Sequence, residues 1–483
     1  MIHFRSIFYL SGWLLIILAM AMMIPVGFSL LFHYQNVDAF VFSSIITLFT
    51  GVLLVFSNRS DREFDFGKRD TFLVTSICWV IGIAFSSLPF IFSNKDMLFT
   101  DAAFEAVSGL TTTGATIFHN LQSIPPGLLV WRAMLEWLGG IGIVVMALTV
   151  MTELRIGGLE LFQSESSDKS EKLLPRVRQM AKLIFTLYVI LTILCFTALF
   201  LAGMGGFDAF CHTLTCVSTG GFSTYDASIG HFNSRLIELI IIVFMFIGGC
   251  SQLLFARTFF GKKSFITKDS QFRSYVKGLL LIILATIVWR LVTTDTDPLE
   301  VIVKTLFNIT AIFTTTGYAS EDYMTWGPFA MVLFFILPFI GGCTGSTTGG
   351  IKIYRFQVLW SIAETQLKKL RRPHGVFVPK FNGKRLSEDL FSSVAGFVIL
   401  FVLSFVGLAL ILAVLGVDFL TAMSAAAAVL TNLGPGLGDI IGPTGNYSTL
   451  SEGVKWCLMV GMIMGRLELL TIYVLFLPSF WKD

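Results

Sequence analysis

The stretch from Phe104 to Ala115 reads FEAVSGLTTTGA, and the chain repeats this pattern from Phe307 as FNITAIFTTTGY. Two weaker copies are FCHTLTCVSTGG from Phe210 and SAAAAVLTNLGP from Ser424. An alignment without gaps places four glycines in register, Gly114, Gly220, Gly317 and Gly434. These glycines lie roughly 100 residues apart, a period that is longer than solenoid repeats and suits whole structural units. The sequence therefore predicts four similar loops around one axis.

The composition predicts that these loops lie within a membrane. Of 483 residues, 55% are hydrophobic and only 13% are charged, which is typical of a polytopic membrane protein. We expect about ten helical spans of about 20 residues each. They lie near residues 7–32, 38–57, 71–92, 127–152, 180–203, 235–257, 277–294, 326–360, 391–416 and 454–479.

Lysines and arginines gather in alternate loops between these spans. If the N-terminus is cytoplasmic, the inner loops hold most of them, including Arg59, Arg62, Lys169, Lys172, Lys262, Lys263, Lys368, Lys369, Arg371 and Arg372. Cytoplasmic loops of membrane proteins are enriched in Lys and Arg. The sequence therefore predicts that both termini are cytoplasmic.

Between the third and fourth spans, the apolar piece from Thr100 to Thr113 is too short, at about a dozen residues, to cross a bilayer. The same long, short, long order recurs three more times. Irregular backbone at membrane depth is tolerated only where protein or a watery cavity surrounds it, so the loops should face one another. We expect an all-α polytopic membrane protein with four helix, pore-loop, helix units around one ion pore. Residues 1–65 would form two extra N-terminal helices, and the four units would be residues 66–160, 161–265, 266–385 and 386–483.

The Thr and Gly residues of these loops suit a path for a dehydrated cation. Backbone carbonyls and Thr hydroxyls replace the water of K⁺ with weak neutral ligands. Glycine permits backbone conformations with positive φ, and the C-terminal end of each short helix favours cations. A single TTTG segment is ordinary helix packing in membranes, whereas four copies in register point to a pore. The candidate ion-binding residues are Thr112, Thr113, Gly114, Thr219, Gly220, Gly221, Thr316, Gly317, Tyr318, Asn432, Leu433 and Gly434.

A glycine-rich segment, residues 341–350, interrupts the span predicted at 326–360. Each glycine costs roughly 1 kcal/mol relative to alanine inside a helix, so the helix should break here. A close-packed kink is the alternative, and a phosphate-binding loop is disfavoured because GxxxxGK[ST] is not matched. The candidate gating residues in this segment are Gly345, Ser346, Thr347, Thr348, Gly349 and Gly350.

Two arginines lie within predicted spans. Arg466 stands in the middle of the last one, where a cation needs a partner or a watery cavity. A pair with Glu468 or another acid is the structural alternative to a place on the ion path. Arg132 and Glu136 are four residues apart, which favours a structural pair on one helix face.

With these four loops, the chain resembles the Trk/Ktr/HKT superfamily of potassium transporters, and most closely its bacterial TrkH branch. The resemblance covers nearly the whole chain and implies four units that mimic a tetrameric potassium channel. Glycine at Gly114, Gly220, Gly317 and Gly434 resembles the K⁺-conducting pattern. The glycine-rich segment resembles a loop that obstructs the path, and Arg466 resembles the family's basic residue below the filter.

The resemblance also implies partners and a location. These are a homodimer with one pore in each protomer, a separate cytoplasmic ring of TrkA-like nucleotide-binding regulators, and the inner membrane of a bacterial cell. K⁺ would be the transported ion, and we expect neither an organic cofactor nor a nucleic acid partner.

The sequence bears on two alternatives to a potassium channel. A membrane enzyme is disfavoured because the spans carry no His/Glu cluster and the chain has neither HExxH nor GxSxG. A secondary active symporter that couples K⁺ to H⁺ or Na⁺ would favour inverted repeats with broken helices. Here each repeat begins and ends inside, which favours a channel-like conductor and leaves coupling open.

Overall fold

The computed structural model describes residues 3–32, 37–59, 68–93, 97–154, 173–261, 266–382 and 384–482. The boundaries predicted at 65 and 160 fall outside these ranges, and the boundary at 265 lies at the edge of one. Five of the predicted inner-loop basic residues also lie outside the described part of the chain, namely Arg62, Lys169, Lys172, Lys262 and Lys263.

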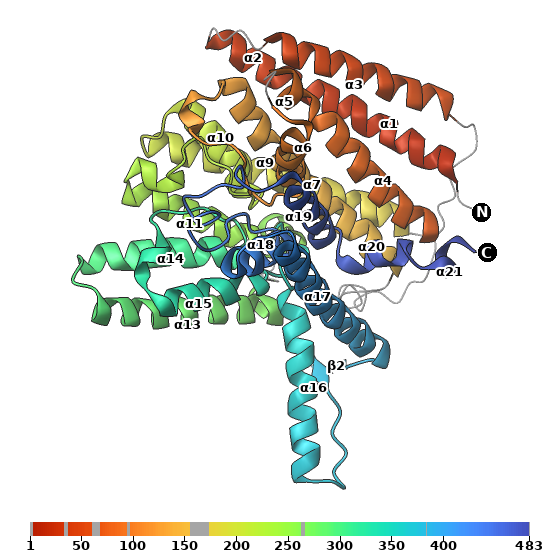
Figure 1. Ribbon diagram of the computed structural model, residues 1–483. Coiled ribbons are helices and arrows are strands. Elements are labelled where there is room, and N and C mark those ends of the chain that lie inside the picture. The colour runs from red at the N-terminus through yellow and green to blue at the C-terminus, as the bar shows by residue number, and fades with distance from the viewer. Residues whose placement is uncertain are drawn as a thin grey trace.

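The two extra N-terminal helices form one edge of the molecule (Figure 1). The first is made of α1 (Phe4–Ala21) and α2 (Met23–Leu31), and the second is α3 (Val37–Ser57). Gly12 and Gly51 allow them to pack closely, because a Cβ on either glycine would lie within 3 Å of the other's carbonyl oxygen, at 2.8 and 2.9 Å. Large apolar side chains such as Phe49 and Phe56 remain exposed on α3, which suits a surface in contact with lipid.

The first two units follow the predicted order of long helix, short helix, loop and second helix. The first contains α4 (Lys68–Ser86), α5 (Leu88–Ser93), α6 (Phe99–Leu110), η1 (Leu121–Ser123) and α7 (Pro126–Leu154). The second contains α9 (Leu173–Leu201), α10 (Gly206–Val217), η2 (Ser228–Phe232), α11 (Arg235–Gly248) and α12 (Gln252–Phe260).

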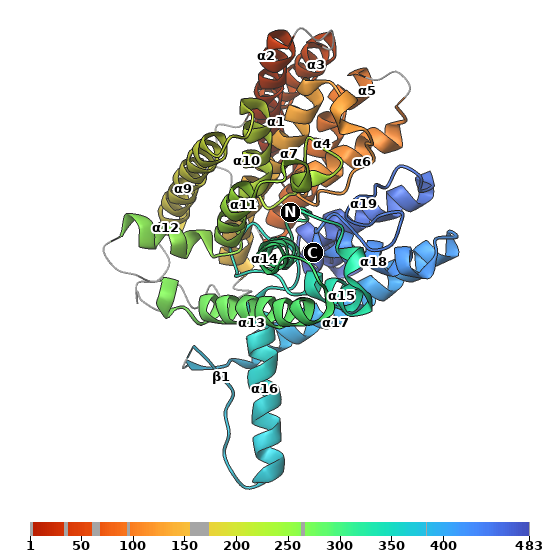
Figure 2. The same cartoon turned by 90° about the vertical axis from the view of Figure 1, so that its left-hand side faces the viewer.

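The third unit adds a long helix that projects from the body of the protein (Figure 2). Its elements are η3 (Ile266–Lys268), α13 (Ser270–Thr293), α14 (Pro298–Phe313), η4 (Tyr323–Trp326), α15 (Pro328–Ile336), η5 (Leu337–Phe339) and α16 (Ile353–Arg371). Two short antiparallel strands, β1 (Lys380–Phe381) and β2 (Lys384–Arg385), follow α16. The fourth unit contains α17 (Glu388–Val414), α18 (Phe419–Thr431), α19 (Glu452–Arg466), α20 (Leu469–Leu475) and α21 (Pro478–Trp481).

Two predicted spans are not straight crossings, which corrects the prediction from hydropathy. The span at 235–257 is divided into α11 and α12 with a bend of 102°, and the span at 454–479 into α19 and α20 with a bend of 111°. The first break lies at Gly249, where a Cβ would overlap the ring of Tyr275. The second lies at Glu468, whose φ of 54° cannot continue a right-handed helix. The span at 326–360 breaks at the glycine-rich segment, as predicted.

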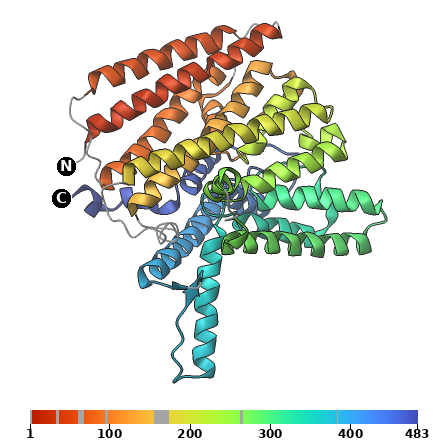
Figure 3. The same ribbon diagram turned by 180° about the vertical axis from the view of Figure 1, so that it is seen from behind.

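Six helices of the described residues are long and apolar enough to cross a membrane, or up to eight if each bent pair counts as one span. The short helices α6, α10, α14 and α18 are not among these spans, and most of their residues are buried. The protein seen from behind has the same arrangement, with α16 extending away from the helical body (Figure 3). The four short helices thus bring their C-terminal ends to the centre of the protein.

Candidate functional site

The four loops that follow the short helices share one backbone conformation. The first residue of each loop has a left-handed φ, at Thr112 (48°), Thr219 (55°), Thr315 (51°) and Asn432 (52°). Two residues later comes a glycine with positive φ, at Gly114 (78°), Gly221 (92°), Gly317 (79°) and Gly434 (96°). We define the pore loops as residues 112–114, 219–221, 315–317 and 432–434.

The backbone hydrogen bonds repeat in the same register. The middle residue of each pore loop donates its N–H to a carbonyl five residues back, Thr113 to Ser108, Gly220 to Thr215, Thr316 to Ala311 and Leu433 to Ala428, at 2.8–2.9 Å. The alignment without gaps is therefore wrong by one residue in the second unit, because Gly221 and not Gly220 matches Gly114. Because Gly220 and Gly221 are adjacent glycines, the sequence alone does not show which of them matches Gly114.

All of the predicted ion-binding residues except Tyr318 lie in these loops. In the third unit the predicted set of Thr316, Gly317 and Tyr318 begins one residue late. Thr315 takes the left-handed position there, and the sequence reasoning missed it. Tyr318 lies beyond the loop, where its hydroxyl donates to the carbonyl of His212 at 3.2 Å and also contacts the Thr215 hydroxyl.

The pore loops contact one another in a closed ring. A Cβ added to Gly114 would overlap the carbonyl oxygen of Gly220 in the second loop. In the same way, Gly221 abuts the carbonyl of Thr316, and Gly317 that of Leu433. Gly434 closes the ring, because its Cβ would overlap the carbonyl of Thr113 in the first loop. Glycine is required at each junction because any side chain would push neighbouring loops apart.

The ring has the electrostatics of a cation site. The C-terminal ends of α6, α10, α14 and α18 lead directly into the four loops, and a helix C-terminus carries partial negative charge. Thr hydroxyls and backbone carbonyls supply the neutral oxygens, and no cluster of His, Cys, Asp or Glu suited to a metal occurs among the described residues.

The glycine-rich segment, residues 341–350, is here called the intramembrane loop. It contacts the second, third and fourth units at or next to their pore loops. Its Thr347 hydroxyl accepts from the Thr219 hydroxyl at 3.0 Å, and its Gly349 N–H donates to the Thr315 hydroxyl at 2.7 Å. Gly350 donates its N–H to the carbonyl of Thr431 at 3.0 Å. The segment is therefore positioned across the pore-helix ends.

Short-range hydrogen bonds hold the intramembrane loop in shape. Lys352 donates to the Thr348 carbonyl at 2.5 Å and to the Ser346 hydroxyl at 3.3 Å. The Ser346 and Thr348 hydroxyls lie 2.7 Å apart. Gly345 bends the segment with a φ of 74° and accepts at its carbonyl from the Gln252 N–H at 3.0 Å.

Arg466 ends α19 and is 5% exposed. Its Nε and Nη2 have no hydrogen-bond partner among the described residues. Glu468 accepts from Arg355 at 2.8 Å instead, and Arg466 forms no ion pair with Glu468 or another acid among the described residues. Arg355 begins α16 and stacks on Phe397, with 3.5 Å between the guanidinium carbon and the ring centre. The first turn of α16 is thus joined to the break that follows Arg466.

The predicted pair of Arg132 and Glu136 does not form. Arg132 instead contacts Glu105 of α6 at 2.5 Å, and Glu136 accepts from the Phe222 N–H at 3.2 and 3.3 Å. Spacing along one helix says which residues share a face. It does not indicate that another helix presents a better partner.

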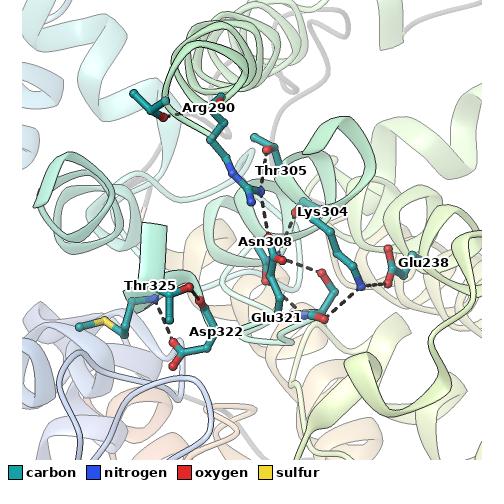
Figure 4. Close-up of polar contacts among 11 residues, drawn as sticks. Glu238, Arg290, Lys304, Thr305, Asn308, Glu321, Asp322 and Thr325 are labelled. Carbon is teal, nitrogen blue, oxygen red and sulfur yellow. Dashed lines mark hydrogen bonds and ion pairs between the residues drawn. The ribbon is translucent and has the colours of Figure 1, made fainter. Parts of the chain in front are cut away.

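A buried polar layer lies outside the ring and was missed by the sequence reasoning. Figure 4 shows the part where the second and third units meet. Lys304 of α14 contacts Glu238 of α11 at 2.6 Å and donates to the Ser320 carbonyl at 3.1 Å. Asn308 accepts from the Ser320 N–H at 3.2 Å, as Glu105 accepts from the Ile117 N–H at 3.1 Å in the first unit. Glu105 and Asn308 each stand seven residues before the left-handed residue of their loop. The alignment of the first and third copies already places Glu105 and Asn308 at the same position, and this shared polar position is the signal that could have revealed the layer.

Comparisons with known proteins agree with this geometry. A profile of the TrkH family, described as a cation transport protein, matches residues 36–482. The Trk system potassium uptake protein TrkI of Halomonas elongata is 43% identical over 413 residues, which cover 85% of this chain and 84% of that protein. The TrkH protein of Escherichia coli is 36% identical over 100% of both chains. The crystal structure of the potassium transporter TrkH from Vibrio parahaemolyticus matches with a TM-score of 0.91 and 36% identity, covering 99% of this chain and 100% of the other. The chain therefore belongs to the TrkH family of cation transport proteins.

Proposed function

We propose that this chain is a potassium-selective, channel-like protein that takes up K⁺ across the cell membrane, with the four pore loops as its selectivity filter. The observation that carries this proposal is the closed ring of glycine and carbonyl contacts between pore loops. Four equivalent backbone carbonyls at one level, with helix C-termini behind them, suit a dehydrated monovalent cation. The relatives named as potassium uptake proteins support K⁺ as the transported ion.

The intramembrane loop is proposed as the gate. Its hydrogen bonds with Thr219 and Thr315 of two pore loops, and with Thr431 next to a third, support this role. Arg466 is proposed as the second part of the gate, because a buried guanidinium with two unpartnered nitrogens repels cations that pass near it. Flow would then require movement of the loop.

A cytoplasmic nucleotide-binding ring of the TrkA type is proposed as the regulator. The end of α16 carries Lys368, Lys369, Arg371 and Arg372, and Leu370 and Val376 are 78% and 93% exposed. A basic surface with exposed apolar side chains suits a soluble protein partner. Because α16 begins directly after the intramembrane loop, a partner at its far end could act on the gate.

The resemblance to the family supports a proposal for the assembly and location. We propose a homodimer with one pore per protomer, in a bacterial inner membrane with both termini cytoplasmic. The mainly exposed faces of α13 and α17 leave room for a second copy or for lipid. Cross-linking in native membranes tests this proposal, and we expect a product with the mass of two chains.

Electrical recording in a bilayer with opposed K⁺ and Na⁺ gradients tests the function. A passive K⁺-selective pore reverses near the K⁺ equilibrium potential at every pH. The alternative, a secondary active symporter coupled to H⁺ or Na⁺, predicts that the reversal potential shifts with the H⁺ or Na⁺ gradient. A protein that conducts neither ion in either arm would refute both functions.

A further inference from the structure

One carboxyl group lies directly behind the ring of pore loops. Glu136 belongs to α7, whose next turn contains Gly139 and Gly140. A Cβ on Gly139 would overlap the carbonyl of Leu110 at the end of α6, and a Cβ on Gly140 would lie 2.9 Å from Ser218 Cβ after α10. These glycines let α7 pack closely against the C-terminal ends of α6 and α10. Glu136, one turn away, is thereby brought against the second pore loop.

The Glu136 carboxyl group contacts the backbone of that loop from two directions. The Phe222 N–H, which immediately follows the loop, donates to its Oε1 and Oε2 at 3.3 and 3.2 Å. The carboxyl also fills the space beside Gly220, where a Cβ would overlap it. Its Oε1 lies 3.6 Å from the Cβ position of Gly114 in the first loop.

No other described side chain takes this carboxyl group as an ion-pair partner. Glu136 is 0% exposed, and the nearest arginine along its helix, Arg132, contacts Glu105. A buried carboxyl with a single backbone donor is costly. Such a group contributes little to the free energy of folding by itself. Its contacts instead support the second pore loop.

The second pore loop needs such a support more than the others. Two of its three residues are glycines, Gly220 and Gly221, and glycine has the largest conformational freedom of any residue. The fourth loop contains one glycine and has a different support, because the Tyr447 hydroxyl donates to the Gly434 carbonyl at 2.7 Å. The Gly220 carbonyl is also the one that meets Gly114 in the ring.

We propose that Glu136 is a positioning residue for ion discrimination, which acts by holding Gly220 and Phe222 through its carboxyl oxygens. The Gly220 carbonyl is thereby fixed at the distance that K⁺ requires. Without this support the two glycines let the loop adapt to a smaller ion, and Na⁺ is admitted. This inference rests on the proposal that the pore loops are the selectivity filter.

Bi-ionic reversal potentials of Glu136 variants test this role. Glu136→Ala should lower the K⁺/Na⁺ permeability ratio about fivefold, a change of about 1 kcal/mol in discrimination at 1.4 kcal/mol per tenfold. Glu136→Gln should retain most of the ratio, because its amide oxygen can still accept from the Phe222 N–H. If Glu136→Ala does not fold, Glu136→Asp withdraws the acceptor by one methylene and should also lower the ratio. Trp137→Phe is the matched control, because it removes a 3.0 Å hydrogen bond from the same helix to Thr192, away from the ring.

Two results would overturn the inference. One is a wild-type ratio in folded, monodisperse Glu136→Ala or Glu136→Asp protein. The other is an equal loss in Glu136→Gln and Glu136→Ala, since the charge and not the acceptor would then matter. Failure of the filter proposal itself is distinguishable, because folded Gly114→Ser protein would then also keep the wild-type ratio.

Discussion

The N–H of Gly350 donates a 3.0 Å hydrogen bond to the carbonyl of Thr431, the last residue of α18. Asn432, the next residue, begins the fourth pore loop. The intramembrane loop is therefore bonded to the backbone from which one quarter of the ring starts. Gly350 can therefore move only if this hydrogen bond breaks or if the Thr431 carbonyl moves with it.

Enlarging the residue beside this bond should open the path. A Cβ on Gly349 would overlap the Thr431 carbonyl oxygen. We expect Gly349→Ala to raise K⁺ flux about fivefold in proteoliposomes without a regulator, which corresponds to about 1 kcal/mol. Gly396→Ala in α17 is the control, because its Cβ meets nothing within 4 Å. Deletion of residues 345–350 should act in the same direction, and wild-type flux in both variants would show that this segment is no obstruction.

Gly114→Ser should reduce discrimination between K⁺ and Na⁺. The serine must adopt a φ of 78° and would press on the Gly220 carbonyl. A non-glycine residue in this region costs about 1–2 kcal/mol, so we expect modest destabilisation and a lower K⁺/Na⁺ ratio. Gly142→Ser in α7, where a Cβ meets nothing within 4 Å, should retain the wild-type ratio. An unchanged ratio in folded Gly114→Ser protein would remove Gly114 from the filter.

Loss of the Arg466 charge should increase flux. Its unpartnered guanidinium repels a cation in surroundings of low dielectric constant, where charges interact strongly. Arg466→Ala should therefore conduct more than wild type in flux assays. Arg466→Lys should lie between them, because it keeps the charge without the planar fork. Lower flux in folded, dimeric Arg466→Ala protein would assign the arginine to packing.

The pair of Lys304 and Glu238 should behave as a buried unit. Their charged atoms lie 2.6 Å apart, and removal of one partner leaves a buried charge without its counterpart. The single substitutions Lys304→Met and Glu238→Gln should each lower the free energy of unfolding by about 3–5 kcal/mol. The double variant should lose less than the sum of the two single losses. Thermal unfolding in detergent compares the stability losses of the two single variants and the double variant. Additive losses would show that the two groups act independently.

Much of the fold follows from the sequence because its signals are local. A piece too short to cross the bilayer must turn back, and Thr100 to Thr113 does so through α6 and the first pore loop. The break at 341–350 is also predicted from a local signal, because glycines weaken any helix. Bends at Gly249 and Glu468 were not predicted, because hydropathy averages over the residues where they occur.

The site was less predictable because its details depend on neighbours in space. Gly220 and Gly221 are chemically identical, and only the hydrogen bond from Gly220 to Thr215 fixes the register. Glu136 and Arg132 have ideal spacing for a pair, yet Glu105 of another helix takes the arginine. A sequence of one chain does not reveal which of two possible partners lies closer.

The ring is built from one continuous chain, and this affects how it can change over generations. In a channel of four identical subunits, one codon change alters all four filter positions at once. Here Thr113, Gly220, Thr316 and Leu433 occupy the four equivalent positions and are encoded separately. A mutation therefore alters a single quarter of the ring while three quarters keep their geometry. Selection can adjust ion preference in small steps, and each quarter can acquire a support of its own.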